Sequence, residues 1–275
     1  MSFSLAEVVR VSHELWPLSG AEEWDAPGLI SGDPDRPVES ILLAVDVVAD
    51  TVTEAIDSGA DLLLAHHPLL LRGVTSVAED RYKGALLARL IRADCALLAA
   101  HTNADVVVDG VSDVFAQRLG LLDVRPITPG ADGSPDTGIG RVGRLPEPTT
   151  LGQLARRLAE FIPPTASGVR ASGGYTDVIE TVALCGGAGD SLLRDPQVRA
   201  ADVFITSDLR HHPVSESREQ TAVAGIGPAL IDVSHWASEW LWLDVAAAQL
   251  RRALPGIRVA VSDLRTDPWD FVVTQ

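Results

Sequence analysis

The sequence predicts an α/β fold with mixed, largely parallel sheets. Apolar runs of strand length alternate with segments of helical pattern along the 275-residue chain, and this alternation is typical of βαβ units. The clearest unit combines the strand SILLAVDVV (40–48), a helix that begins at Asp50 and is stopped by Gly59, and the strand DLLLAHH. Strands joined by a helix in this way are expected to pair in parallel.

The first half of the chain continues this pattern. Residues 4–16 form a predicted amphipathic helix, and EEWDAPGLISGDPDRP (22–37) is expected to be a loop because it is dense in Gly, Pro and Asp. A helix near 82–93 and a strand at 95–100 extend the βαβ unit, and a further helix is expected near 111–119.

A segment rich in Gly and Pro, TPGADGSPDTGIGRVGRLPEP (128–148), predicts a domain boundary. Beyond it we expect a helix at 151–162, for which Thr149 or Thr150 is the candidate N-cap. The remaining predicted elements are strands near 167–171, 178–185, 201–206 and 257–262, a short helix after the turn GGAGD (186–190), and a long helix at about 235–253. No repeated segment is evident in the sequence.

Composition argues against several classes of protein. The net charge is −16, which disfavours nucleic-acid binding because phosphate contacts need clustered Lys or Arg. No apolar stretch approaches the roughly 20 residues that span a bilayer, and the N-terminus lacks the basic start and apolar centre of a signal peptide. We therefore expect a cytoplasmic protein that binds neither nucleic acid nor membrane. Cys95 and Cys185 lie among apolar residues, and without a CxxC pair a cysteine-type zinc site is not expected.

Six of the seven histidines lie in four clusters, and each cluster follows an apolar run. The clusters are His66-His67, His101, His211-His212 and His235. A carboxylate follows four residues after two of them: Asp105 follows His101, and Glu239 follows His235. Apolar runs bounded by polar residues predict buried strands, and side chains at the ends of strands in one sheet gather in one crevice. The pattern therefore indicates a metal site on an α/β scaffold.

The first two clusters each have a structural alternative. Adjacent His66 and His67 cannot both face one site from a regular strand, but Pro68 allows the strand to end and the chain to bend. The alternative is a pair of surface histidines. In a helical segment His101 and Asp105 would share one face, whereas the alternative makes the Thr-Asn between them a helix cap.

The last two clusters differ in strength. Ser234 is a good N-cap, so His235 and Glu239 are expected one turn apart on the same face of the following helix. The alternative for Glu239 is an ordinary acidic residue near a helix start. His211 and His212 could contact the ligands of a metal or recognise a substrate, and the alternative is a solvated turn.

Together these side chains supply imidazole and carboxylate ligands for two metal ions, without cysteine. This set suits zinc, iron, manganese or cobalt and disfavours calcium. A bridged pair of such ions lowers the pKa of water towards neutrality and binds an attacked oxygen. The GGAGD turn could admit an anion to a helix N-terminus, but a tight turn without a ligand is the favoured interpretation.

Six motifs in order along the chain carry a family resemblance. They are WDAPGL (24–29), LLLAHHPLL (62–70), HTNAD (101–105), ALCGGAGDSLL (183–193), ITSDLRHH (205–212) and DVSHWASE (232–239), and the similarity continues to TDPWDFV (266–272). These motifs resemble the Nif3-like family, whose members are also called GTP cyclohydrolase 1 type 2 homologues or DUF34 proteins. Four motif positions depart from the family pattern, Ala26, Ala104, Ser207 and Ser234, and none of them is a proposed ligand.

The resemblance implies a Nif3-like fold of two interlinked α/β domains, a dinuclear metal centre and a toroidal homohexamer. Carried over by motif, the metal ligands would be His66, His67, Asp105, His235 and Glu239, with Glu239 as the bridge. His101 would lie beside the ions. If the protein is a hydrolase, we expect His101 or His212 to be the catalytic proton carrier. We assign residues 1–125 and 232–275 to the metal-site domain and 126–231 to the second domain.

Two functions are consistent with this site. The first is a metal-dependent, cyclohydrolase-like hydrolase that acts on a nucleotide-like or other small anionic substrate. The alternative is a non-catalytic metal-binding or regulatory protein in metal handling. An open position beside the ions would favour the hydrolase, and a closed ligand shell would favour the alternative.

Overall fold

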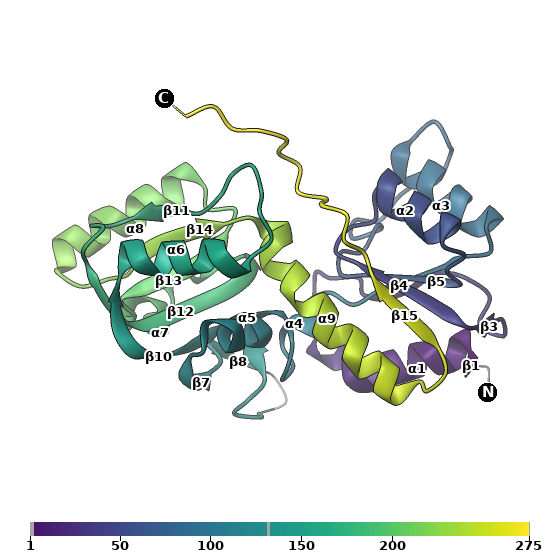
Figure 1. The fold of residues 1–275 in the computed structure, drawn as a ribbon, viewed down its shortest axis with the longest axis horizontal. Helices are drawn as coiled ribbons and strands as arrows, with labels where there is room; N and C mark the ends of the chain where they lie inside the picture. Colours follow the sequence, from purple (N-terminus) through teal and green to yellow (C-terminus); the bar gives the residue numbers. More distant parts are fainter. Residues whose placement is uncertain (1–2, 131–132, 275) are drawn as a thin grey trace. The chain divides into compact units, whose positions relative to one another are not determined.

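The computed structural model describes residues 3–130 and 133–274, and the chain divides into two units that each contain one main sheet (Figure 1). Unit 1 comprises Met1–Ala104 and Leu243–Thr266, and unit 2 comprises Asp105–Trp242 and Asp267–Gln275. Among the described residues no helix combines the length and the apolar composition needed to cross a bilayer.

The sheet of unit 1 is built around the predicted βαβ unit. Its strands are β2 (Gly28–Ser31), β4 (Ser40–Ala44), β5 (Leu62–Ala65), β6 (Ala96–Ala99) and β15 (Arg258–Val261). They lie in the order β15-β4-β5-β6-β2, and all neighbours are parallel except β2, which is antiparallel to β6. Every residue of β4, β5 and β6 is buried, because these strands are central in the sheet and covered by helices on both faces. The short strands β1 (Phe3–Ser4) and β3 (Pro37–Val38) pair separately.

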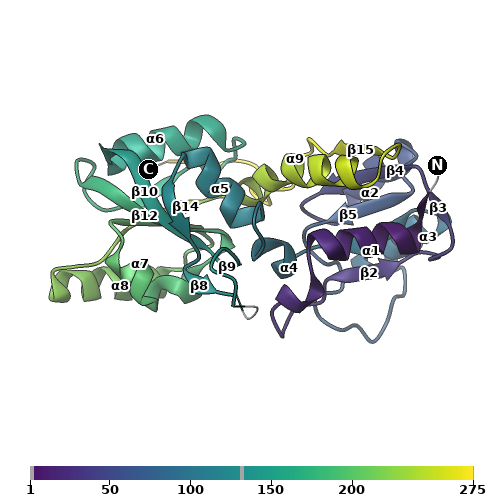
Figure 2. The same cartoon turned by 90° about the horizontal axis from the view of Figure 1, so that it is seen from below.

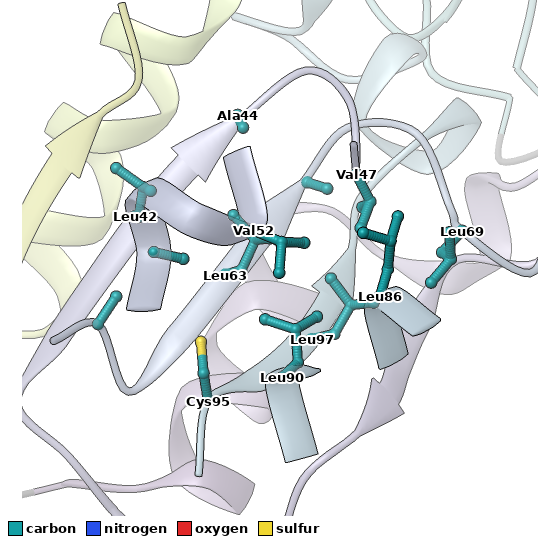
Figure 3. Close-up of a cluster of buried hydrophobic side chains, with 13 residues drawn as sticks. Leu42, Ala44, Val47, Val52, Leu63, Leu69, Leu86, Leu90, Cys95 and Leu97 are labelled. Carbon is teal, nitrogen blue, oxygen red and sulfur yellow. The ribbon is translucent and has the colours of Figure 1, made fainter. Parts of the chain in front are cut away.

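Helices cover both faces of this sheet. The helices α2 (Ala49–Asp57) and α3 (Tyr82–Arg92) pack on one face, where Leu42, Val52, Leu63, Leu90 and Leu97 belong to one buried cluster (Figure 3). On the other face lie α1 (Leu5–Leu15), followed by the short η1 (Leu18–Gly20), and the unit 1 part of α9 (His235–Ala253) (Figure 1). The predicted helix at 4–16 is thus confirmed as α1.

The sheet of unit 2 is mixed, in the order β11-β14-β13-β12-β10-β7. Its strands are β7 (Leu122–Arg125), β10 (Arg141–Thr150), β11 (Arg170–Ser172), β12 (Val178–Ala188), β13 (Val203–Ser207) and β14 (Ala229–Val233). The pairs β12–β13 and β13–β14 are parallel and the others are antiparallel. The helices α5 (Val111–Leu119) and α6 (Leu151–Phe161) lie on one face, and α7 (Pro196–Ala200) and α8 (His211–Ala224) lie on the other (Figure 2). Shorter elements are α4 (Thr102–Asp105), β8 (Thr128–Pro129), β9 (Gly138–Ile139) and η2 (Asp190–Arg194).

The second half of segment 128–148, where the sequence predicts a domain boundary, is mostly a strand of the unit 2 sheet. Residues from Arg141 onward form β10, an inner strand paired with both β12 and β7. Gly143 permits this pairing, because a Cβ there would lie 2.8 Å from the carbonyl oxygen of Leu122. Pro146 and Pro148, which cannot donate to a ladder, fall where the register with β12 shifts between Arg144 and Thr149.

The unit boundaries differ from the predicted domains. The prediction placed residues up to 125 and residues from 232 onward with the first domain, whereas unit 2 includes residues 105–125 and 232–242. The physical reason is packing, since β7 pairs with β10 and α5 packs against β10 and β12. The predicted helix at 151–162 is α6, and Thr150 is its N-cap in a capping box with Gln153.

The two sheets share a hydrogen-bonded motif that the sequence does not reveal. In unit 1, Oδ2 of Asp61 accepts hydrogen bonds from the backbone N–H of Ser40 at 2.9 Å and from its hydroxyl at 3.0 Å. In unit 2, Oδ2 of Asp202 accepts from the N–H of Thr181 at 2.7 Å and from its hydroxyl at 2.8 Å. Each aspartate returns its own N–H to the same hydroxyl. We call these two sets of hydrogen bonds, Asp61 with Ser40 and Asp202 with Thr181, the clasps. Each clasp joins adjacent parallel strands where their pairing begins.

Candidate metal centre

His66 and His67 directly follow β5, at its carboxyl end. Their backbone N–H groups donate to the carbonyls of Ala44 and Val45 at 3.0 and 2.8 Å, which continues the hydrogen bonding to the neighbouring strand. His66 is fully buried and His67 is half-buried. Their ring centroids lie 5.1 Å apart, so the alternative of two unrelated surface histidines does not describe this pair.

Both rings are held through Nδ1 by an oxygen that accepts hydrogen bonds. The Nδ1 of His66 lies 2.8 Å from the carbonyl oxygen of Ala100, and the Nδ1 of His67 lies 2.7 Å from Oδ1 of Asp46. A carbonyl or an ionised carboxylate can only accept, so Nδ1 carries the proton in each ring and Nε2 carries the lone pair in the neutral form. This is the arrangement that fixes the tautomer and orientation of metal-binding histidines.

His101 follows β6, and its ring is also held through Nδ1. Its Nδ1 lies 2.8 Å from Oδ1 of Asp25, and Oδ2 of Asp25 accepts from the N–H and the hydroxyl of Thr102 at 3.0 and 2.5 Å. Burial of Asp25 would raise its pKa, but the hydrogen bonds from His101 and Thr102 outweigh burial and hold the pKa well below its usual range. Asp25 is therefore an ionised acceptor for His101.

The HTNAD motif orients His101 from its backbone as well. Asn103 accepts the N–H of His101 at 2.9 Å and donates to the carbonyl oxygen of Trp16 at 2.8 Å. One ligand nitrogen from each of His66, His67 and His101 lies within 4.8 Å of the other two. These three histidines of unit 1 could therefore hold a metal ion, and we call them the imidazole group.

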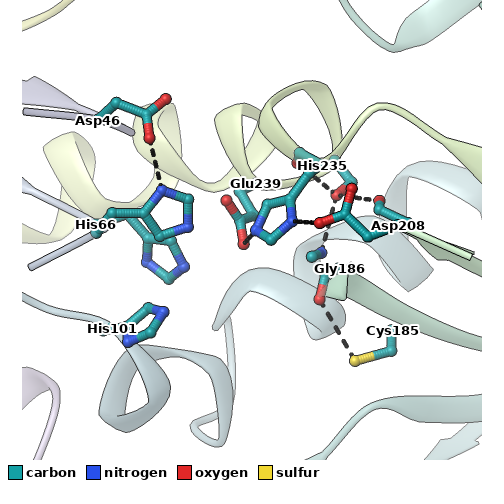
Figure 4. Close-up of polar contacts among 12 residues, drawn as sticks. Asp46, His66, His101, Cys185, Gly186, Asp208, His235 and Glu239 are labelled. Carbon is teal, nitrogen blue, oxygen red and sulfur yellow. Dashed lines mark hydrogen bonds and ion pairs between the residues drawn. The ribbon is translucent and has the colours of Figure 1, made fainter. Parts of the chain in front are cut away.

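In unit 2, His235 and Glu239 lie one turn apart at the start of α9, as the sequence predicts. Nε2 of His235 is 2.9 Å from Oε1 of Glu239, and its Nδ1 is 2.7 Å from Oδ2 of Asp208 (Figure 4). Burial alone would lower the pKa of His235, but the carboxylates of Glu239 and Asp208 outweigh burial and raise it to about 11. This environment favours a positive charge on or beside the ring.

The surroundings of this pair come from two strand ends. Asp208 follows β13 with a φ of 56°, a left-handed conformation that Asp tolerates better than most residues. Ser234 follows β14 and accepts the N–H of Ala237 at 3.2 Å, which is the predicted cap contact. Glu239 is 3% exposed. We call His235, Glu239 and Asp208 the carboxylate group.

Asp105 ends α4 in unit 2. Burial and then the charge of Asp105 are the main causes that raise the pKa of the Cys185 thiol to about 12, and the charge of Glu239 adds to them. Both predicted carboxylate ligands therefore act on the same thiol. Cys185 itself is buried and kept protonated, as expected of a structural cysteine.

The GGAGD turn has a role that was not predicted. Gly187 has a φ of 68°, and a Cβ on it would lie 2.5 Å from Oε1 of Glu239 and 3.3 Å from Nε2 of His235. Ser238 accepts its N–H at 3.0 Å, and Thr206 donates to its carbonyl oxygen at 3.0 Å. The absence of a side chain at Gly187 therefore makes room for His235 and Glu239, two of the predicted metal-binding residues.

His211 and His212 lie in the first turn of α8, and both are exposed. Their ring centroids are 5.2 Å apart. Among the described residues His212 belongs to no group that could hold a metal ion, and its role as a proton carrier stays a prediction. Sequence reasoning missed the anchoring residues Asp25, Asp46 and Asp208. Asp25 and Asp208 do lie within motifs of the family resemblance, WDAPGL and ITSDLRHH.

The fold and these side chains define an α/β protein with groups of histidines and carboxylates that could bind a metal. The chain belongs to the Duf34/NIF3 family (NGG1p interacting factor 3), whose family model matches residues 3–268. A Streptomyces coelicolor relative called "GTP cyclohydrolase 1 type 2 homolog" is 47% identical over 270 residues, which cover 96% of this chain and 93% of the relative. A Mycobacterium tuberculosis relative of the same name is 35% identical, with 98% of both chains covered.

Solved structures agree at the level of the fold. A Bacillus cereus protein related to NIF3 superposes with a TM-score of 0.89 at 23% identity, covering 98% of this chain and 99% of that one. A hypothetical protein of Staphylococcus aureus superposes with a TM-score of 0.85 at 28% identity and the same coverage. The Nif3-like α/β fold predicted from the motifs is therefore confirmed.

Proposed function

We propose that the protein binds two divalent metal ions and hydrolyses a nucleotide-like or other small anionic substrate. The observation that carries the proposal is shared by four histidines, namely His66, His67, His101 and His235. In each of them Nδ1 is held by a carbonyl or carboxylate oxygen at 2.7 to 2.8 Å. Anchoring of this kind orients Nε2 for a metal and raises its basicity.

The donor set fits two ions better than one. The imidazole group supplies three nitrogens, and His235, Glu239 and Asp105 add a nitrogen and two carboxylates. This exceeds the four ligands of a typical zinc site. Nitrogen and carboxylate donors without a thiolate suit zinc, iron, manganese or cobalt. The cradle that Gly187 leaves for Glu239 supports Glu239 as the ligand shared between the ions.

We propose His101 as a third imidazole ligand in place of its predicted role as a proton carrier. Its ring is anchored as those of His66 and His67 are, and its ligand nitrogen lies within 4.8 Å of theirs. The buried carboxylate of Asp25 would hold this ring in position in the presence or absence of substrate. His212 then remains the proposed proton carrier.

The ions, when bound, would lower the pKa of a coordinated water and polarise an oxygen of the substrate. The residues of the chain hold the ligands in place: Asp25 and Asp46 orient two rings of the imidazole group, and Asp208 orients His235. We propose GTP as the first substrate to test, because the Streptomyces coelicolor relative is called a GTP cyclohydrolase 1 type 2 homolog. We also propose a cytoplasmic homohexamer, as the resemblance implies.

The test compares wild type with Glu239→Gln and with Glu219→Gln, which makes the same chemical change at an exposed position. Each protein is stripped, reconstituted with zinc, manganese or iron, desalted and analysed for metal. We expect about two ions per chain in wild type and Glu219→Gln, and a clear loss in Glu239→Gln. Less than one ion per wild-type chain would overturn the dinuclear proposal.

Activity is tested separately on metal-replete wild type with GTP, other nucleotides and small phosphorylated or amide substrates. Turnover should appear only with metal and should fall on chelation. Two bound ions without turnover on any substrate would overturn the hydrolase and favour the alternative of a metal-handling protein.

A further inference from the structure

The C-terminal segment after β15 contacts the carboxylate that anchors His67. The hydroxyl of Thr266 donates to Oδ2 of Asp46 at 2.5 Å, while Oδ1 of the same carboxylate receives the Nδ1–H of His67 at 2.7 Å. Each oxygen of the Asp46 carboxylate therefore has its own hydrogen-bond donor. The Thr266 hydroxyl fixes the rotation of the carboxylate, and the carboxylate fixes the rotation of the imidazole.

The next residue makes the corresponding contact in unit 2. The hydroxyl of Ser234 donates to Oδ2 of Asp267 at 2.5 Å, and the same hydroxyl oxygen caps α9 through the N–H of Ala237. His235 is the first residue of that helix. Because the Ser234 hydroxyl donates its hydrogen bond to Asp267, its oxygen is free to accept the N–H of Ala237 at the start of the helix. An anionic side chain at a helix N-terminus is also favourable to the helix dipole.

We infer that Thr266 and Asp267, two consecutive residues, are positioning residues for the two groups of metal-binding side chains. The inference rests on the proposed function. Thr266 acts through Asp46 on His67, and Asp267 acts through Ser234 on the turn of α9 that carries His235. Partners of this kind set the orientation and basicity of a ligand without touching the metal, and their loss typically weakens metal affinity by about 10-fold to 100-fold.

Packing of the segment does not account for these two contacts. Residues 262–274 form no helix or strand, and the large side chains that follow Asp267 are open to solvent, with Trp269 65% and Phe271 79% exposed. An unsupported tail of this kind gains little from burial. The side-chain hydrogen bonds of Thr266 and Asp267 place it instead at the residues that hold His67 and His235.

The first experiment removes the Thr266 hydroxyl at constant shape. Zinc affinity is measured by competition with a chromophoric chelator for wild type, Thr266→Val, Thr266→Ser and Thr274→Val, the last being an exposed threonine of the same tail. We expect Thr266→Val to bind zinc about tenfold more weakly, with its unfolding temperature unchanged. Thr266→Ser and Thr274→Val should match wild type. Equal affinity of Thr266→Val and wild type, or an equal loss in Thr266→Ser, would overturn the inference.

The second experiment applies the same logic to Asp267. We expect Asp267→Ala to weaken zinc binding by about tenfold, whereas Asp270→Ala, which removes an exposed carboxylate three residues away, should leave it unchanged. Equal affinities of these two variants would remove Asp267 from the inference.

A third readout needs no metal and separates the inference from the proposed function. In metal-free protein the Nδ1–H proton of His67 should exchange with water faster in Thr266→Val than in wild type, as followed by NMR. If wild type bound no metal, the proposed function would fail, and the exchange rate would still decide whether Thr266 orients His67. Unchanged exchange would overturn the positioning role.

Discussion

Replacement of Gly187 by alanine is expected to weaken metal binding at the carboxylate group without unfolding the protein. The added methyl carbon would lie 2.5 Å from Oε1 of Glu239, well inside the 3.4 Å at which ordinary contact begins. Oε1 is at the end of the flexible side chain of Glu239, so we expect the carboxylate to move and the backbone to stay in place. It must move by about 0.9 Å to restore ordinary contact, and metal–ligand distances tolerate only about 0.2 Å.

The loss of one correctly placed ligand should weaken metal binding by at least the 10-fold to 100-fold seen for changes in the outer shell. The backbone adds a separate cost, because a non-glycine residue at a φ of 68° loses about 1 to 2 kcal/mol of stability. Gly225, at the end of α8, isolates that cost. It has the same φ of 68°, and a Cβ on it meets nothing within 4 Å.

The assay is a chelator competition for zinc together with thermal unfolding of the metal-free proteins. Gly187→Ala and Gly225→Ala should lose similar stability, and only Gly187→Ala should lose affinity for zinc. If Gly187→Ala bound zinc as tightly as wild type, Glu239 could not be a ligand where the structure places it. If both variants lost zinc equally, the effect would come from backbone strain and the steric reasoning would be refuted.

Three further outcomes are expected. His101→Ala should lower the metal content of reconstituted protein while His212→Ala keeps it, and full metal content in both variants would return His101 to the role of proton carrier. The pKa of Asp202 is lowered below its ordinary 3.8, because hydrogen bonds from Thr181 and Glu180 outweigh burial. Its contribution to stability should therefore be complete above about pH 5 and disappear as the pH falls through 3.8 to the folded-state value. Asp202→Asn should cost about 1 to 2 kcal/mol at neutral pH and lack this part of the pH dependence in urea unfolding, and parallel pH profiles would contradict this assignment. Light scattering at moderate salt should report about six chains, and a stable monomer would contradict the hexamer.

Most of the fold could be predicted because its central strands are continuous apolar runs. Every residue of β4, β5 and β6 is buried. Because both faces of these strands are buried, almost every position is apolar, and each strand can be recognised in the sequence. The helix α8 was missed for the opposite reason. None of its residues is buried, so no apolar stripe marks it, and the segment with His211 and His212 resembled a turn. The strand β10 was missed because its Gly and Pro residues are typical of linkers.

The site could be predicted only as far as its histidines and the carboxylates beside them in sequence. The anchoring carboxylates are distant along the chain: Asp25 lies 76 residues before His101, and Asp208 lies 27 before His235. Spacing cannot pair such residues, because only the folded sheet brings them together. The signal that could have found Asp46 and Asp208 is their position after an apolar run, the same feature that singled out the histidines.

In both units, the side chains at the two ends of the parallel strands have different roles. Where pairing begins, the clasps of Asp61 and Asp202 tie adjacent strands together, which fixes a register that a slip of one residue would invert. At the opposite ends of the strands lie Asp46, His66 and His101 in unit 1, and Asp208 and Ser234 in unit 2. Within each unit, side chains at those strand ends can approach one another without disturbing the sheet. Substitutions at the clasps should therefore change stability while metal binding persists, and substitutions at the opposite ends should change metal binding while the sheets persist.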